Sequence, residues 1–366
     1  MKQRRYDLDW LRVISVFAVF LHHVFMPFNG DEFHIMNSEH SKLLDDIMVY
    51  FEQFRLPLLF LVSGVGTVFA FSKRSWKRFV FERNLRLLIP FVFGILILIP
   101  PQVYFENIND FTSFLEAYPE IVKKVKVHHL WFIGNLLLMS IFFIPLILFL
   151  KSKRSVGFRD LIEKYTVKFG MLFWVFALFS LFIISKHYFP STSKSITNLS
   201  STIYFSFYFV SGIIMTSCNN LWEVLYRNRK RNLTFTLIFS VLFYLYYFIP
   251  GKYVKPYFSL ENRWRLWYLM CCLVSWSFVI TSLGYSQLFL NVKSKLLEKF
   301  NKAVYPFYLL HQTVIICIGY YVLKLDLNIV MKILILFISS LIVIFLVYRF
   351  MVYPFRLIRF LFGMKK

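Results

Sequence analysis

The residue best suited to carry chemistry in this sequence is His23, because an imidazole titrates near neutral pH and can move a proton there. It follows Asp9 and Arg12 in one apolar segment. At about 100° per residue, His23 lies about 40° from Asp9 and about 20° from Arg12 around a helix axis, and His22 lies about a further 100° away. This stripe predicts that His23 faces the same protein interior as Asp9 and Arg12. Alternatively, Asp9 and Arg12 anchor a helix end and His23 makes a packing contact.

A second polar group follows. Glu52 and Arg55 are three residues apart, which predicts an ion pair on one helical face. Pro57 permits a local break in that helix. Three small residues then let another helix, or an extended ligand, come close: Ser63, Gly64 and Gly66.

Arg83 and Arg86 form the next candidate site. Two arginines three apart on a helix present two guanidinium groups side by side, which is a geometry that binds phosphates. We expect an anion arriving from the cytosol to meet this pair first. The alternative is an anchor formed by basic residues at the cytoplasmic end of a membrane helix.

Two more histidines lie at or within apolar segments. His129 opens one such segment, where interfacial histidine and tryptophan are common. His311 lies about eight residues into another, deep enough to be inside the hydrocarbon. A buried histidine needs a partner, which can be a purely structural hydrogen bond.

The composition predicts the elements that position these residues. The chain has 366 residues, of which 58% are hydrophobic and only 17% charged, as expected for an all-α polytopic membrane protein. The first apolar segment lacks a small-residue cleavage site and is not a signal peptide. About ten membrane helices are expected, over residues 10–28, 47–71, 86–105, 129–150, 169–189, 201–218, 233–250, 266–290, 303–323 and 328–350.

The basic residues predict orientation. The net charge of +23 comes from lysines and arginines at the ends of apolar segments, a distribution that favours lipid headgroups over nucleic acid. With both termini in the cytoplasm, about 26 basic residues lie inside and about 10 outside. Those inside include Arg4, Arg5, Arg74, Lys77, Arg78, Lys151, Lys153, Arg154, Arg159, Lys164, Lys168, Arg227, Arg229, Lys230, Arg231, Lys293, Lys295, Lys299 and Lys302.

No repeat or linker divides the chain, so one membrane-embedded domain over residues 1–366 is expected, with no soluble domain. The four cysteines have no paired spacing, which indicates neither a metal site nor a disulfide framework. The longest outer loops, 29–46, 106–128 and 251–265, carry acidic residues that could hold a sugar acceptor or simply be solvated. These are Asp31, Glu32, Asp45, Asp46, Glu106, Asp110, Glu116, Glu120 and Glu261.

Together these motifs resemble the acyltransferase-3 superfamily of integral membrane O-acyltransferases, in family order and over nearly the whole chain. They are Asp9-Trp10-Leu11-Arg12 with His23, Arg55-Leu56-Pro57-Leu58-Leu59-Phe60 with Ser63-Gly64, Arg83 and Arg86 with Pro90, His129-Leu130-Trp131-Phe132, and Tyr305-Pro306-Phe307-Tyr308-Leu309-Leu310-His311. Several are similar to the glucan biosynthesis protein C branch, the periplasmic glucan succinyltransferases. This chain has Leu56 where that branch has methionine, and Val62 before Ser63.

The resemblance implies a ten-helix multi-pass protein of the cytoplasmic membrane. It implies transfer of an acetyl or succinyl group from a cytoplasmic acyl-coenzyme A to a hydroxyl of an extracytoplasmic polysaccharide, glucan or glycolipid. Acyl-coenzyme A would be a co-substrate, with no permanently bound cofactor or metal. By motif, His23 takes the catalytic role and Arg83 with Arg86 handles the donor; Arg12, on the stripe of His23, could line the donor channel.

The chemistry suits these residues. Neutral imidazole can take the proton of a hydroxyl that attacks a thioester carbonyl. His23 is expected about 20–25 Å from Arg83 and Arg86, a distance that a pantetheine arm can span. Direct transfer is preferred here, and an acyl-histidine intermediate remains open. The alternative functions are a polysaccharide exporter or flippase built from the same helices, and a structural membrane scaffold.

Overall fold

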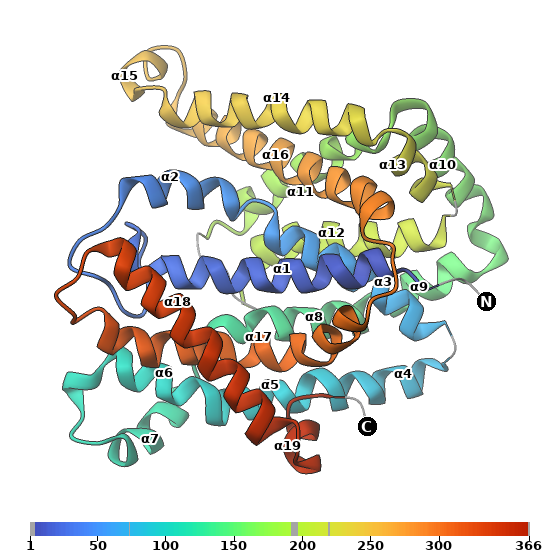
Figure 1. The fold of residues 1–366 in the computed structure, drawn as a ribbon. Helices are drawn as coiled ribbons and strands as arrows, with labels where there is room; N and C mark the ends of the chain where they lie inside the picture. Colours follow the sequence, from blue (N-terminus) through green and yellow to red (C-terminus); the bar gives the residue numbers. More distant parts are fainter. Residues whose placement is uncertain (1–3, 73, 192–196, 219, 365–366) are drawn as a thin grey trace. The chain divides into compact units, whose positions relative to one another are not determined.

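The computed structural model describes residues 4–72, 74–191, 197–218 and 220–364, and these residues form helices joined by turns and loops, with no strand among them (Figure 1). The expected all-α fold is therefore confirmed. The chain divides into two compact units. Unit 1 comprises Met1–Arg12, Gln53–Trp76 and Met139–Lys293, and unit 2 comprises Val13–Glu52, Lys77–Leu138 and Ser294–Lys366.

Unit 1 holds the start of α1 (Tyr6–Phe25) and nine further helices. These are α3 (Arg55–Phe71), α9 (Ile144–Lys151), α10 (Val156–Phe169), α11 (Val175–Tyr188), α12 (Leu199–Ser217), α13 (Leu221–Arg227), α14 (Arg229–Phe248), α15 (Gly251–Val254) and α16 (Leu260–Phe289). The long helices α14 and α16 run side by side (Figure 1). Their buried hydroxyls meet at Thr236 and Thr281, whose Oγ1 atoms lie 2.9 Å apart.

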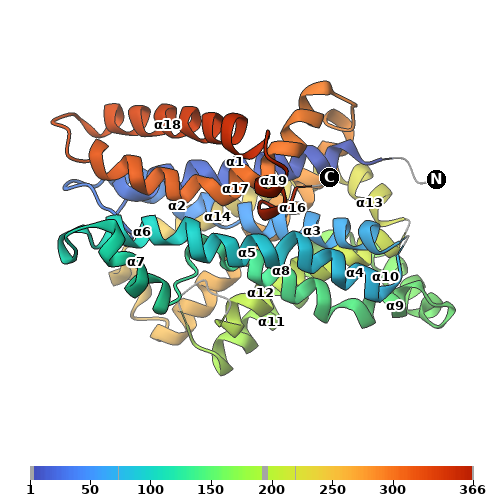
Figure 2. The ribbon, with the colours of Figure 1, turned by 90° about the horizontal axis from the view of Figure 1, so that it is seen from below.

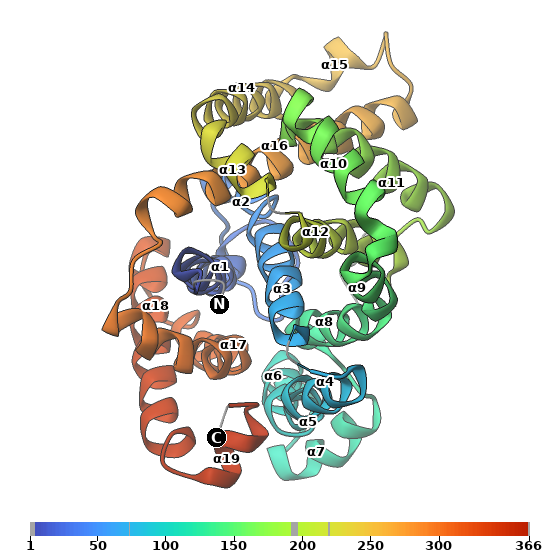
Figure 3. The same cartoon turned by 90° about the vertical axis from the view of Figure 1, so that its right-hand side faces the viewer.

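The closest helix contact in unit 1 joins α3 and α12, which lie side by side in Figure 3. A Cβ atom on Gly64 would lie 2.0 Å from the carbonyl oxygen of Phe209, and one on Gly212 would lie 2.2 Å from that of Leu61. Only glycine permits this approach, because the opposing atoms are backbone. The predicted close packing is thus confirmed for Gly64, whereas a Cβ on Gly66 would meet nothing within 4 Å.

Unit 2 holds the remainder of α1 and the C-terminal part of the chain. Its helices and short 3₁₀ or π segments are η1 (Met26–Phe28), α2 (Lys42–Phe51), α4 (Trp76–Arg83), η2 (Asn84–Leu88), α5 (Ile89–Phe93), η3 (Gly94–Leu98), α6 (Ile99–Glu106), η4 (Ile108–Asp110), α7 (Phe114–Lys123), η5 (His128–Leu130), α8 (Trp131–Phe142), α17 (Lys295–Val322), α18 (Ile329–Leu346), η8 (Val347–Val352) and α19 (Arg356–Leu361). In Figure 2, α17 runs between α18 and α6. Helix α17 packs on both neighbours.

Prolines shape the third predicted membrane helix, which is α-helical only in part. The π segments η2 and η3 each end two residues before a proline, Pro90 and Pro100. Proline has no backbone N–H for the bond to the fourth preceding carbonyl. The backbone adapts with wider turns, in which the N–H groups of Ile89 and Ile99 bond to the carbonyls of Asn84 and Gly94.

Nine helices in the described part of the chain are long and apolar enough to cross a membrane. They begin at Tyr6, Lys42, Trp76, Phe114, Met171, Leu199, Leu260, Lys295 and Ile329. The segment expected at 233–250 is also helical, as α14, but it is not among the nine. Its polar start, which includes Arg231 and Asn232, and its tyrosines lower its mean hydropathy. Orientation stays a prediction.

One expected helix is interrupted. The segment predicted at 47–71 consists of α2 and α3, and residues 52–54 between them form a turn. Glu52 and Arg55 therefore do not lie on one helix, and the expectation that they share a helical face was wrong. Pro57 lies in the first turn of α3, where proline is tolerated.

Candidate functional site

The predicted base, His23, meets His311 within unit 2. Near the end of α1, His23 Nδ1 lies 2.8 Å from Nε2 of His311 on α17. The two rings are nearly parallel, with their centroids 5.0 Å apart. His311 is 1% exposed, whereas His23 is partly exposed, so one imidazole is sealed in protein and bonds to another that is partly open to solvent.

The surroundings of His311 fix the tautomer of both rings. His311 Nδ1 bonds to the backbone carbonyl of Tyr308, which can only accept, so Nδ1 carries the proton. In the neutral ring, Nε2 of His311 then accepts, and Nδ1 of His23 donates to it. His23 Nε2 is therefore the unprotonated nitrogen, the form that a general base requires.

His129 joins this pair from the start of the α8 segment. Its Nε2 donates to the carbonyl of Leu309 over 3.2 Å, and its ring centroid lies 5.1 Å from that of His311. The hydroxyl of Tyr308 donates to the backbone carbonyl of His129. His129 is thus buried within the protein, 5% exposed, and its expected place at the membrane interface stays a prediction.

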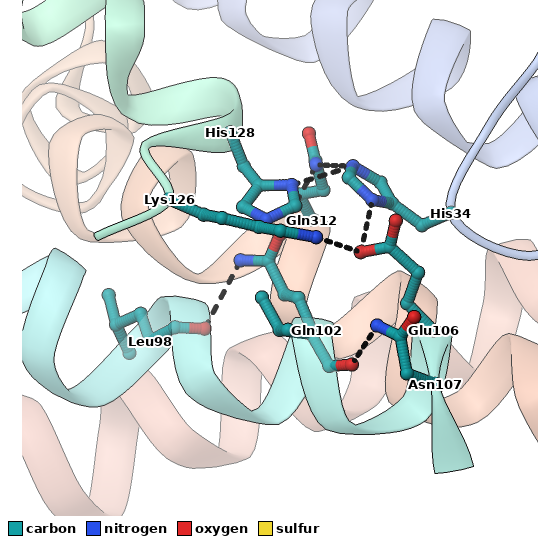
Figure 4. Close-up of polar contacts among 9 residues, drawn as sticks. His34, Leu98, Gln102, Glu106, Asn107, Lys126, His128 and Gln312 are labelled. Atoms are coloured by element: carbon teal, nitrogen blue, oxygen red, sulfur yellow. Dashed lines mark hydrogen bonds and ion pairs between the residues drawn. The ribbon is translucent and has the colours of Figure 1, made fainter. Parts of the chain in front are cut away.

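Two residues that follow His311 extend the polar site toward other segments. Gln312 Nε2 lies 2.9 Å from His34 Nε2 and 3.2 Å from Gln102 Oε1 (Figure 4). Thr313 accepts from Gln102 Nε2 over 2.8 Å and donates to the Leu98 carbonyl. Three consecutive side chains of α17 therefore bond to α1, to the loop after it and to α6.

The arginines lie elsewhere in unit 2. Arg83 ends α4, and its guanidinium carbon lies 4.9 Å from the centroid of the Phe79 ring. Arg86 lies in the π segment η2, whose turns are wider than those of an α-helix, so the pair departs from the expected α-helical spacing. The backbone of Arg86 lies close to Gly363 near the C-terminus, since a Cβ on Gly363 would lie 2.7 Å from the Arg86 carbonyl oxygen.

Asp9 and Arg12 form an ion pair in unit 1. Their carboxylate and guanidinium lie 3.2 Å apart, and Arg4 approaches the same carboxylate at 2.7 Å. Arg55 is also in unit 1, 5% exposed near the start of α3. The structure thus joins His23, His311 and His129, and it places Asp9, Arg12 and Arg55 in the other unit.

Sequence analysis missed His34, Gln102, His128 and Gln312 and treated Glu106 only as one of many loop acids. These residues come from four separate segments, so no spacing along the chain reveals their proximity. The available signal was the pair His128-His129 at the end of a loop predicted to lie outside, of which only His129 was selected.

One comparison with known proteins identifies a family. A family model described as an acyltransferase domain matches residues 5–349. Neither a curated protein nor a solved structure matches the chain.

Proposed function

The chain belongs to the acyltransferase-3 family of membrane acyltransferases, and we propose that it transfers an acetyl or succinyl group from a cytoplasmic acyl-coenzyme A to a hydroxyl of an extracytoplasmic polysaccharide, glucan or glycolipid. The multi-pass helices and the family support acyl transfer in a membrane. The observation that carries the proposed mechanism is the hydrogen bond from His23 to His311, because it leaves His23 Nε2 unprotonated.

In this mechanism, the acceptor oxygen attacks the thioester carbonyl carbon while His23 Nε2 takes the hydroxyl proton. The new C–O bond forms, the C–S bond breaks, and the departing thiolate receives the proton from His23. His311 stabilises the transient imidazolium because its Nε2 lone pair accepts the bond from His23 Nδ1. General base catalysis of this kind contributes about 10²–10⁴ in rate. Direct transfer needs no acyl-histidine intermediate.

The basic residues support the proposed orientation. If the positive-inside bias holds, both termini lie in the cytoplasm and the donor enters from the side of Arg83 and Arg86. Their guanidinium groups suit the phosphates of coenzyme A. The similarity of several motifs to the glucan branch supports a glucan acceptor, and the cytoplasmic membrane is the compartment where both substrates are accessible.

Deletion of the gene tests this function against polysaccharide export. We expect mass spectrometry of the envelope glycans to show the glycan still outside the cell but without its ester-linked acyl groups. Loss of the extracellular glycan itself would instead support an exporter. Complementation with the wild-type gene should restore the ester, and its mass identifies the acyl group.

A further inference from the structure

A second histidine cluster in unit 2 is not used by the proposed mechanism. His34 Nδ1 lies 3.4 Å from Glu106 Oε2, and His34 Nε2 lies 3.0 Å from His128 Nδ1 (Figure 4). His34 comes from the loop after α1, Glu106 ends α6, and His128 begins η5. Each residue offers one ligand atom, and the three atoms lie within 4.8 Å of one another.

Hydrogen bonding alone does not fully satisfy this cluster. A neutral His34 that donates from Nδ1 to Glu106 has one lone pair, on Nε2. Two nitrogen atoms approach that lone pair: Gln312 Nε2 lies 2.9 Å from His34 Nε2, and His128 Nδ1 lies 3.0 Å from it. On the other side of its ring, His128 Nε2 is buried and has no hydrogen-bond partner among the described residues. The imidazoles are thus held together without enough acceptors for their donors.

The backbone at His128 supports a special role. Its φ angle is +42°, and that of Val125, three residues earlier, is +36°. Such left-handed conformations are uncommon for residues other than glycine, are least favourable for a β-branched residue such as valine, and cluster at functional sites. This short loop therefore brings His128 to His34 at a cost in backbone energy.

We propose that His34, Glu106 and His128 bind one divalent transition-metal ion, of which Zn²⁺ fits best, with a fourth position open to water or to a hydroxyl. Two imidazoles and one carboxylate are a ligand set that catalytic zinc sites use. Ligand atoms about 2.1 Å from a tetrahedral ion lie about 3.4 Å from one another. The contacts of 3.0 and 3.4 Å are made by opposite nitrogens of the His34 ring, so only one of them can join two ligand atoms. The three ligand atoms, one from each residue, lie within 4.8 Å of one another, and side-chain shifts of about 1 Å would bring them to the tetrahedral spacing.

The remaining surroundings are compatible with an ion. Lys126 Nζ lies 3.6 Å from Glu106 Oε2, but this lysine is 42% exposed and its long side chain can move away. Glu106 is 28% exposed, so an ion can enter from solvent. If the side-chain amide of Gln312 is rotated by 180°, its Oε1 and Nε2 atoms exchange places and the shape of the side chain stays the same. Gln312 Oε1 can then accept a hydrogen bond from a ring N–H.

The site would stabilise the outer segments next to the catalytic pair. His34 bonds to Gln312, the neighbour of His311, and Phe33 stacks on His23 with ring centroids 6.0 Å apart. An ion that joins His34, Glu106 and His128 would fix the loop, α6 and η5 to one another. It would thereby hold Phe33 over His23, next to the position where the acceptor arrives.

Metal binding is tested with the purified full-length protein, carrying an affinity tag without histidine. After treatment with a chelator, the protein is titrated with Zn²⁺ against a chromophoric chelator, and its metal content is measured by mass spectrometry. We expect one zinc per chain, and an affinity lowered at least about tenfold by His128→Ala and by Glu106→Gln. Zn²⁺ should also raise the Tm of the wild type but not of these variants.

The matched control is His187→Ala, which removes an exposed histidine of unit 1 and should leave zinc binding unchanged. Co²⁺ serves as a second probe, because four-coordinate Co²⁺ absorbs visible light and His128→Ala should abolish that band. Less than one tenth of a zinc per chain, or binding that persists in both variants, would overturn the proposal. None of these measurements depends on acyl transfer, so this site can fail while the proposed function stands.

Discussion

Unit 1 and unit 2 differ in what their buried residues do. Seven of the eight histidines belong to unit 2, and only His187, which is exposed, belongs to unit 1. Unit 1 instead has the close contact of α3 with α12 through Gly64 and Gly212. Unit 1 therefore has close helix packing and ion pairs at the start of α1, whereas unit 2 brings histidines together.

The difference teaches where substitutions should affect abundance and where they should affect rate. In unit 1, a side chain that is too large meets backbone atoms, which cannot move aside. In unit 2, the clustered histidines depend on the order of their hydrogen bonds, which can change without unfolding the protein. Three predictions test this separation, from the largest expected effect to the smallest.

The first concerns His311, a positioning residue that acts through His23. His311→Ala should lower kcat about 10²-fold, because the acceptor that fixes the His23 tautomer is lost. His311→Gln should retain much of the activity, since its amide oxygen can accept from His23 Nδ1. Initial rates in membranes containing equal amounts of protein measure both. Equal losses in the two variants would contradict the role of His311 as the acceptor for His23 Nδ1.

The second prediction concerns the α3–α12 contact. Gly64→Ala should destabilise the protein by about 1–3 kcal/mol or more, since the added Cβ would lie 2.0 Å from the Phe209 carbonyl oxygen. Thermal unfolding in detergent and membrane abundance measure the effect. Gly66→Ala on the same helix is the matched control and should be neutral or slightly stabilising. Normal abundance of Gly64→Ala with lost activity would contradict the comparison.

The third prediction concerns the proposed donor site. Arg83→Ala and Arg86→Ala should each raise the KM for acyl-coenzyme A about tenfold with a smaller change in kcat, as expected when binding that is equal in the ground and transition states is lost. Arg78→Ala, which removes an arginine that is 74% exposed, is the control. A loss of kcat without a change in KM would place these arginines outside the donor site.

Much of the fold could be predicted because hydrophobic length determines membrane helices. The boundaries of α12 and α18 lie within a few residues of those expected. The turn at residues 52–54 and the π segments before Pro90 and Pro100 were not predicted. They depend on the local backbone geometry and not on the length of the apolar segment. Helix α14 shows the limit of composition, since a regular 20-residue helix can be only moderately apolar.

The site was predictable only one residue at a time. Helical geometry selected His23 over His22, and the structure places His23 on His311, although His22 is buried as well. The partners lie far apart in sequence: 288 residues separate His23 from His311, and 72 separate His34 from Glu106. Spacing along the chain carries no information on such pairs, so the tertiary fold had to be known.

The central claim is that His23, held by His311, takes the proton of the acceptor hydroxyl. Its most direct test is the initial rate of acyl transfer by the purified protein in proteoliposomes, from labelled acyl-coenzyme A to envelope glycan of the deletion strain. The account predicts that His23→Ala loses about 10²–10⁴ in rate, with unchanged abundance, and that the adjacent His22→Ala keeps near-wild-type activity. Equal losses in both variants, or none in either, would contradict it.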